Sequence, residues 1–308
     1  MCKKANRFYL VLLVWYVAAS FGIGLFLRGI DLPLWGSLCL SQCFILLPGL
    51  LFLLIQKINP FKCFGFRVLK PLDVLLSILF GYTLIPLILL LNYVSMLFAT
   101  NEMQSTSTEL AYNYPIVVQF LLMAVMPACV EEFVFRGILF HMHRKNGVIG
   151  AAVVTGVAFG LFHLNFNQFM YAFVLGIILA LLVEATSSLF SSMLAHFAVN
   201  TYSLILLNLI PQSFYEQAQQ ETQMVSVGAI GNIVIIVMFA MFAAAGLCIS
   251  FVIYRTLAKR NNRWEYMKTS IQQGFVRRNG EHFLTAPYWV AVVCSVAFMV
   301  YAELQHFL

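Results

Sequence analysis

The sequence predicts an all-α fold, a polytopic bundle of eight or nine transmembrane helices with a polar cavity inside the membrane. Of the 308 residues, 62% are hydrophobic and only 10% are charged, whereas soluble domains carry about 25% charged residues. The mean hydropathy is +0.89. Apolar runs of about 20 residues, enough to cross a hydrocarbon core, recur along the whole chain. They leave no stretch that could form a separate soluble domain.

The apolar runs set the order of the expected spans. They lie near residues 8–27, 34–56, 74–99, 115–140, 148–164, 168–184, 187–210, 226–254 and 286–304. The runs at 148–164 and 168–184 are at the lower edge of the spanning length, so we expect them to be tilted, broken or partly re-entrant. Whether the ninth run crosses the membrane is left open.

The distribution of Lys and Arg predicts the orientation. Sixteen of the eighteen basic residues precede the first run or follow the second, fourth and eighth runs, while the alternate loops at 100–114 and 211–224 have none. Because basic loops stay in the cytoplasm, we expect a multi-pass cell-membrane protein with a cytoplasmic N-terminus. The net charge of +6 is then explained by loops that face anionic lipid, and no nucleic-acid partner is expected.

Polar side chains inside the apolar runs mark a candidate site, because an ionisable group at the membrane centre costs at least about 2.5 to 3.5 kcal/mol. Spans four to seven contain Glu131, Glu132, Arg136, His163, Glu184, His196 and Asn200. Glu184 ends its span and is expected to reach the cytoplasmic interface. His141 and His143 lie beside basic residues at the same boundary, where interfacial solvation is favoured over a metal site.

Two adjacent carboxylates in span four have different surroundings. Glu132 and Arg136 are four residues apart with the acid first, the favourable order for an ion pair on a helix. Glu131 points about 100° away from Glu132 and has no local countercharge. An unpaired carboxylate in such a place is either protonated and hydrogen-bonded or exposed to a wet cavity, where it can act as a general base.

The remaining polar residues have helical spacing too. His196 and Asn200 share one face of span seven, and Phe159 and His163 share one face of span five. A carboxylate and an imidazole can polarise a water while a second imidazole and an amide stabilise an oxyanion. Equally, Glu131, His163 and His196 could hold a divalent metal such as Zn²⁺ with a water as fourth ligand. Spacing does not separate these two readings.

Three motifs on spans four, five and seven, "EEFVFR" (131–136), "FGLFH" (159–163) and "HFAVN" (196–200), resemble the patterns EExxxR, FxxxH and HxxxN. These are the patterns of the CAAX-processing and bacteriocin-processing intramembrane endopeptidases, also called the CAAX prenyl protease 2 or abortive-infection family. Gly176 looks like the small residue that the family has before its third motif. The resemblance covers about residues 115–205.

The resemblance implies a role for each matched residue. Glu131 and His163 would activate the attacking water, His196 and Asn200 would form the oxyanion site, and Glu132 with Arg136 would hold the helix in place. A metal remains conditional, and the chain lacks the HExxH pattern of common zinc proteases. The expected division is spans one to three (1–114), a protease core (115–210), and C-terminal spans with a basic cytoplasmic loop (211–308).

The resemblance leaves the substrate open. Eukaryotic relatives cleave prenylated CAAX proteins, whereas bacterial relatives are linked to peptide maturation or bacteriocin immunity. We favour an unmodified peptide or membrane-protein tail as the substrate, within the lipid bilayer, and the oligomeric state is left open. The alternatives are a non-catalytic immunity protein of the same fold and a proton-coupled transporter, which would also place Glu, His and Arg at the midplane but predicts repeat symmetry that the chain does not show.

Overall fold

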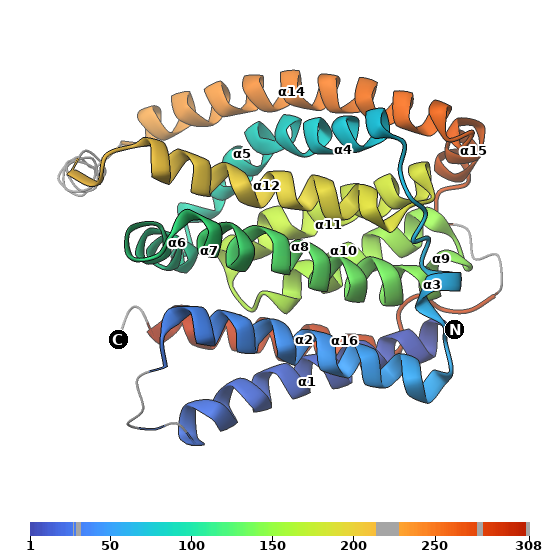
Figure 1. Ribbon diagram of the computed structural model, residues 1–308, viewed down its shortest axis with the longest axis horizontal. Helices are drawn as coiled ribbons and strands as arrows, with labels where there is room; N and C mark the ends of the chain where they lie inside the picture. The colour runs from blue at the N-terminus through green and yellow to red at the C-terminus, as the bar shows by residue number, and fades with distance from the viewer. Residues whose placement is uncertain (27, 29–31, 214–227, 276–279, 306–308) are drawn as a thin grey trace.

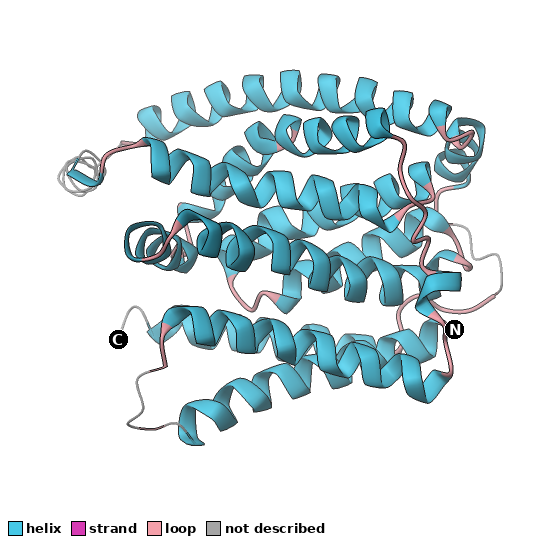
Figure 2. Cartoon of the chain, viewed as in Figure 1, coloured by secondary structure: helices cyan, strands magenta, loops and turns pink. Residues whose placement is uncertain are grey.

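The computed structural model describes residues 1–26, 28, 32–213, 228–275 and 280–305, and every regular element in these ranges is a helix (Figure 2). Eight helices of the described chain are long and apolar enough to cross a membrane. The predicted polytopic bundle is therefore confirmed. The crossing segments are Cys2–Phe26, Leu34–Gln56, Pro71–Met96, Ile116–Arg144, Phe166–Thr186, Leu189–Leu209, Ala229–Arg260 and Ala286–Gln305.

The long helices run side by side along one direction (Figure 1). Helices α1 (Cys2–Phe26) and α2 (Leu34–Gln56) pack on each other, and α1 also contacts α16 (Ala286–Gln305). The third span is divided into α4 (Pro71–Thr83) and α5 (Ile85–Met96), because Pro86 at the start of α5 cannot donate a helical hydrogen bond. The short helices outside the spans are α3 (Pro60–Cys63), α6 (Glu102–Asn113) and α15 (Trp264–Gln273).

The fourth span is one continuous helix with two π-helical stretches. It comprises α7 (Ile116–Phe120), η1 (Leu121–Val125), α8 (Met126–Glu132), η2 (Phe133–Phe140) and α9 (His141–Arg144). Stretches of π-helix are rare and often lie at functional sites. Here the second one begins directly after the two glutamates.

The fifth and sixth spans differ in length. Helix α10 (Val148–Phe162) has 15 residues, shorter than a full crossing, as expected from its run. Helix α11 (Phe166–Thr186) has 21 residues and is long enough to cross, so the expectation that it would be broken or re-entrant is wrong. The Asn165 side chain accepts a hydrogen bond from the Gln168 N–H and begins α11 two residues earlier than the apolar run.

Glycines allow α10 and α11 to pack closely. A Cβ atom on Gly176 of α11 would lie 2.8 Å from the Cα of Gly156 on α10, closer than real Cβ contacts. Small residues at a helix interface let the backbones approach in a membrane. The two helices therefore form a tight pair, against which the fourth span and α12 (Leu189–Leu209) pack. Helix α14 (Ala229–Arg260) packs against α4 and α5, at the edge of the bundle opposite α1 and α2.

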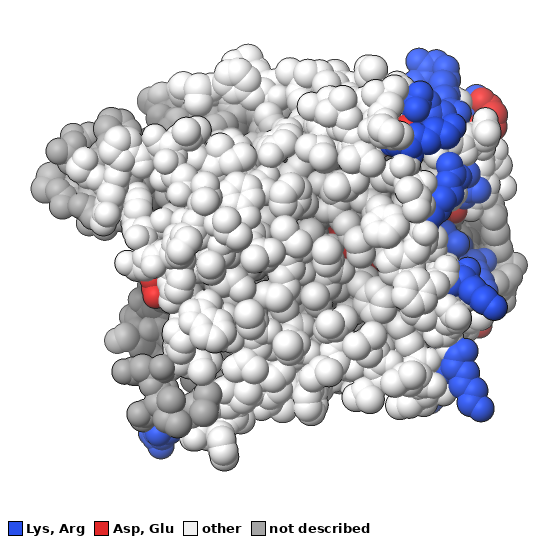
Figure 3. Space-filling model, in the orientation of Figure 1, with Lys and Arg blue, Asp and Glu red and all other residues white. Residues whose placement is uncertain are grey.

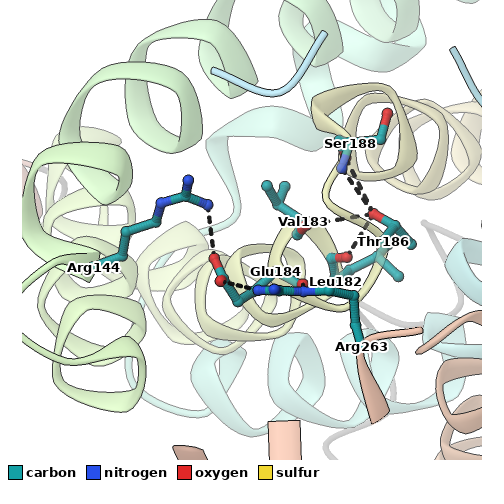
Figure 4. A network of polar contacts seen from close by, with 7 residues as sticks. All are labelled: Arg144, Leu182, Val183, Glu184, Thr186, Ser188 and Arg263. Carbon is teal, nitrogen blue, oxygen red and sulfur yellow. Dashed lines mark hydrogen bonds and ion pairs between the residues drawn. The ribbon is translucent and has the colours of Figure 1, made fainter. Parts of the chain in front are cut away.

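Basic side chains of the described residues gather at the end of the bundle that carries α3, α9 and α15 (Figure 3). At this end Glu184 is 3% exposed, and it forms ion pairs with Arg144 at 2.8 Å and Arg263 at 2.5 Å (Figure 4). Glu184 therefore lies at the basic end of the bundle, where its span ends, but it is buried because two arginines from α9 and the start of α15 cover it. The carboxylate thus ties the fourth span, α11 and α15 together.

The two histidines of "HMH" have different environments. His143 is 1% exposed, with its Nδ1 atom 2.9 Å from the Leu139 carbonyl oxygen and its Nε2 atom 2.9 Å from Asn6 Oδ1. Interfacial solvation is therefore wrong for His143, whereas His141 is half-buried. In the ranges that the structure describes, no group of three or more His, Cys, Asp and Glu side chains is arranged to hold a metal ion.

We predict that Glu184→Gln lowers the free energy of unfolding by about 2 to 3 kcal/mol, since it removes a charged acceptor from two arginines. Both arginine side chains are about a third exposed or less, so water relieves part of the effect. The measurement is denaturant unfolding of the purified protein in detergent.

Glu265→Gln is the matched control. Glu265 makes a surface ion pair with Lys268 on α15, with 80% of its side chain exposed, and such pairs contribute little. Equal stability of the two variants would contradict a structural role for Glu184.

Candidate functional site

Glu132 is the centre of the predicted site. Its side chain is fully buried, and its Oε1 atom lies 2.8 Å from Nη1 of Arg136 and 3.0 Å from Nδ1 of His196. The predicted helical ion pair is therefore present, and it extends to a histidine on α12. Its second oxygen, Oε2, is buried and has no hydrogen-bond partner among the described residues.

Arg136 connects this pair to the α10–α11 pair. Its Nη2 atom donates to the Gly176 carbonyl oxygen at 3.4 Å, and the guanidinium carbon lies 4.3 Å from the centre of the Phe159 ring. A guanidinium over an aromatic face is stabilised by the ring quadrupole. Four helical segments thus converge on one buried ion pair.

Glu131 lies on the other side of His196. Its Oε2 atom is 4.0 Å from His196 Nε2 and its side chain is 13% exposed, whereas the side chain of Glu132 is fully enclosed. The difference follows from the turn of about 100° between neighbouring helical residues.

His163 caps the end of α10 and is held by a backbone contact. Its Nδ1 atom lies 2.8 Å from the Phe159 carbonyl oxygen. A carbonyl only accepts hydrogen bonds, so Nδ1 carries the proton, and in the neutral ring Nε2 keeps a lone pair. Glu131 and His196 lie within Coulombic range of this ring, and Phe159 stands edge-to-face between the two imidazoles, at 4.9 Å from His163 and 5.9 Å from His196.

The same reasoning fixes the hydrogen positions on His196. Its Nδ1 atom donates to the Glu132 carboxylate, which in its ionised form can only accept. The Nε2 atom faces Glu131. It offers a lone pair in the neutral ring and an N–H donor in the imidazolium form.

Asn200 lies one helical turn beyond His196 on α12 and is half-buried. Across the described chain, no hydrogen bond joins its side-chain amide to another site residue. The structure therefore brings Glu131, Glu132, Arg136, His163 and His196 together, while Asn200 shares their helix face without a direct contact.

The described residues include no group of three or more His, Cys, Asp and Glu side chains arranged to hold a metal ion, and Glu131, His163 and His196 are no exception. The Nδ1 atoms of the two histidines are bonded, to the Phe159 carbonyl oxygen and to Glu132. Histidines that bind a metal also have their other ring nitrogen bonded in this way, so these bonds do not exclude a metal, and the conditional Zn²⁺ stays a prediction.

Comparison with known proteins finds a match over the part of the chain that contains this cluster. Residues 113–202 match the family model described as Rce1-like, type II CAAX prenyl endopeptidase. The match spans 90 of the 308 residues, and this matched segment is called the Rce1-like domain below. It contains all six predicted site residues and nearly coincides with the stretch on which the resemblance rests.

A curated relative matches part of the chain. The "Putative membrane peptidase YdiL" of Bacillus subtilis (strain 168) is 25% identical over 124 residues, which are 40% of this chain and 50% of that protein. The chain thus matches half the length of this relative. No solved structure gives a significant match.

Among the described residues, Gln42 makes a polar contact with a site residue from outside the Rce1-like domain. Gln42 on α2 donates from Nε2 to Glu131 Oε1 at 3.4 Å. Gln42 could not be predicted from helical spacing, because it lies on another helix, 89 positions before Glu131. The sequence does show a polar amide inside an apolar run at this position, but such amides are also common where membrane helices simply pack on one another.

We predict that Glu132→Ala destabilises the protein by about 3 to 5 kcal/mol, because it leaves the enclosed Arg136 guanidinium without its countercharge. Glu131→Ala, at the neighbouring position, removes a partly exposed carboxylate and should change stability much less. Unfolding of both variants in the same detergent distinguishes them. If the two substitutions were equally tolerated, Glu132 would not have the structural role assigned here.

Proposed function

We propose that the chain is an intramembrane endopeptidase that hydrolyses peptide bonds with a water activated by Glu131 and His163. The observation that carries the proposal is the cluster inside the Rce1-like domain, where Glu131 is reachable and Glu132 is paired. Its membership of a family described as endopeptidases and its similarity to a membrane peptidase support the same reaction class.

In the proposed reaction a water oxygen attacks the carbonyl carbon of the scissile bond. Glu131, or the Nε2 lone pair of His163, takes the water proton. The bond between the carbonyl carbon and the amide nitrogen then breaks, and the same proton is returned to the leaving amine. Both groups lie on the incompletely buried side of the cluster, which suits access by water and substrate.

The negative charge that develops on the carbonyl oxygen needs donors. Asn200 supplies an amide N–H, and His196 supplies an N–H from Nε2 when both of its ring nitrogens carry protons. Glu132 and Arg136 act by holding His196. No step uses a metal, because the donors are not arranged for one.

The proposed substrate is an unmodified peptide or the tail of a membrane protein. The bundle presents an extensive apolar surface, so a segment already in the bilayer can reach the site laterally. We also propose that the basic end faces the cytoplasm, since most basic residues lie there.

We expect purified protein in lipid nanodiscs to cleave members of a library of peptides and membrane-anchored tails. Glu131→Ala and His163→Ala should each lower kcat by about 100-fold to 10,000-fold, the contribution of a positioned general base. Mass spectrometry of the products is the measurement. A chelator should leave the cleavage unchanged.

Three results would contradict parts of this scheme. Cleavage that persists in both variants would overturn the assigned site. Cleavage lost only with the chelator would contradict the metal-free scheme. No cleavage by the wild-type chain would favour an immunity or transport function.

Asn200→Ala tests the oxyanion site separately. We expect kcat to fall by about 100-fold to 1,000-fold with little change in KM, because the donor acts on charge that appears only in the transition state. Asn208→Ala on the same helix is the control, since Asn208 bonds Gln119 and the Leu204 carbonyl instead. A change in KM alone would assign Asn200 to substrate binding.

A further inference from the structure

We propose that Gln42 on α2 is a positioning residue for the Glu131 carboxylate and completes the site from outside the Rce1-like domain. The inference rests on the proposed function for the role of Glu131. The contact itself does not depend on that function, so it can be tested separately.

The amide nitrogen of Gln42 donates a hydrogen bond to Glu131, and the amide oxygen has no partner among the described residues. Its Nε2 atom donates to Glu131 Oε1 at 3.4 Å, and no other hydrogen bond to this carboxylate is found among the described residues. The distance exceeds the usual range of about 2.7 to 3.2 Å, and catalytic contacts are often long before substrate binds. The Oε1 atom of Gln42 is buried without a partner in the described chain, so it can accept a hydrogen bond from the attacking water.

Packing two turns further along α2 sets the register of this contact. A Cβ on Gly49 would lie 3.1 Å from Val134 Cγ2 and 3.4 Å from Ile138 Cδ1. Gln42 and Glu131 are 89 positions apart, as are Gly49 and Ile138. Equal offsets mean that α2 and the fourth span run parallel, so the fit of Gly49 holds the amide opposite the carboxylate.

Other groups also act on Glu131, and their contribution is unchanged when Gln42 is replaced. His196 lies at 4.0 Å, and Arg136 and His163 are within Coulombic range. So are the hydroxyl groups of Tyr16 from α1 and Tyr171 from α11.

A purely structural role is the alternative, since amides commonly bond between membrane helices. Loss of such a bond would loosen α2 without a specific effect on the Glu131 carboxyl. The decisive readout therefore has to report on that carboxyl alone.

The test uses the full chain in nanodiscs with Gln42→Met, which keeps the length of the side chain and removes the amide. Dicyclohexylcarbodiimide modifies protonated carboxyls in apolar surroundings, and mass spectrometry gives the extent at Glu131. Without the donated hydrogen bond the charged carboxylate is less stable, so we expect labelling at neutral pH to rise about threefold or more. The matched control is Gln56→Met on the same helix. The Gln56 amide oxygen accepts a hydrogen bond from Lys4 at the basic end, so the extent of labelling at Glu131 in this variant should equal that in the wild type.

Glu131 labelling that is no greater in Gln42→Met than in the wild type, or that rises equally in Gln56→Met, would overturn the proposal. This arm needs no peptide cleavage, so it stands even if the proposed function fails. Where the library yields a cleaved peptide, kcat for that peptide should fall about tenfold in Gln42→Met with KM within about twofold. A rise in KM with unchanged kcat would instead assign Gln42 to substrate binding and would also overturn a positioning role.

Discussion

The Oε1 atom of Glu132 is the point on which the architecture of the site depends. It forms an ion pair with Arg136 and accepts a hydrogen bond from His196, and Arg136 in turn contacts α10 and α11. Charges buried in an apolar bundle are tolerated only when paired, so each partner is needed by the other two. These contacts therefore hold the fourth span, α10, α11 and α12 in one arrangement.

This arrangement gives the adjacent Glu131 and Glu132 different surroundings. Glu132 is fully enclosed and directed to His196 Nδ1, which sets the proton on that nitrogen and turns Nε2 toward Glu131. Glu131 keeps its carboxylate at the edge of the cluster, beside a histidine whose free nitrogen is set by the Phe159 carbonyl. Neighbouring residues on a helix can therefore serve structure and chemistry, because they point in different directions.

Local patterns in the sequence predicted what depends on one helix at a time. The apolar runs, the Glu132–Arg136 pair and the shared face of His196 and Asn200 follow from hydropathy and helical spacing. Contacts between helices could not be predicted in this way. Burial of Glu184 requires Arg144 and Arg263 from two other helices, and the π-helical stretch after Glu132 changes a spacing that a regular helix would have kept.

The exposure of the site residues gives a direction for substrate approach. Glu132, Arg136 and His196 are buried, whereas His163 and Asn200 are half-buried and Glu131 is partly open. Of the four residues assigned to water activation and oxyanion binding, three are incompletely covered and His196 is buried, while the covered Glu132 and Arg136 hold His196 in place. In the proposed reaction a peptide bond approaches the side of the cluster that carries Glu131, which Gln42 of α2 contacts. Since α2 lies outside the matched domain, an N-terminal span forms part of the proposed site.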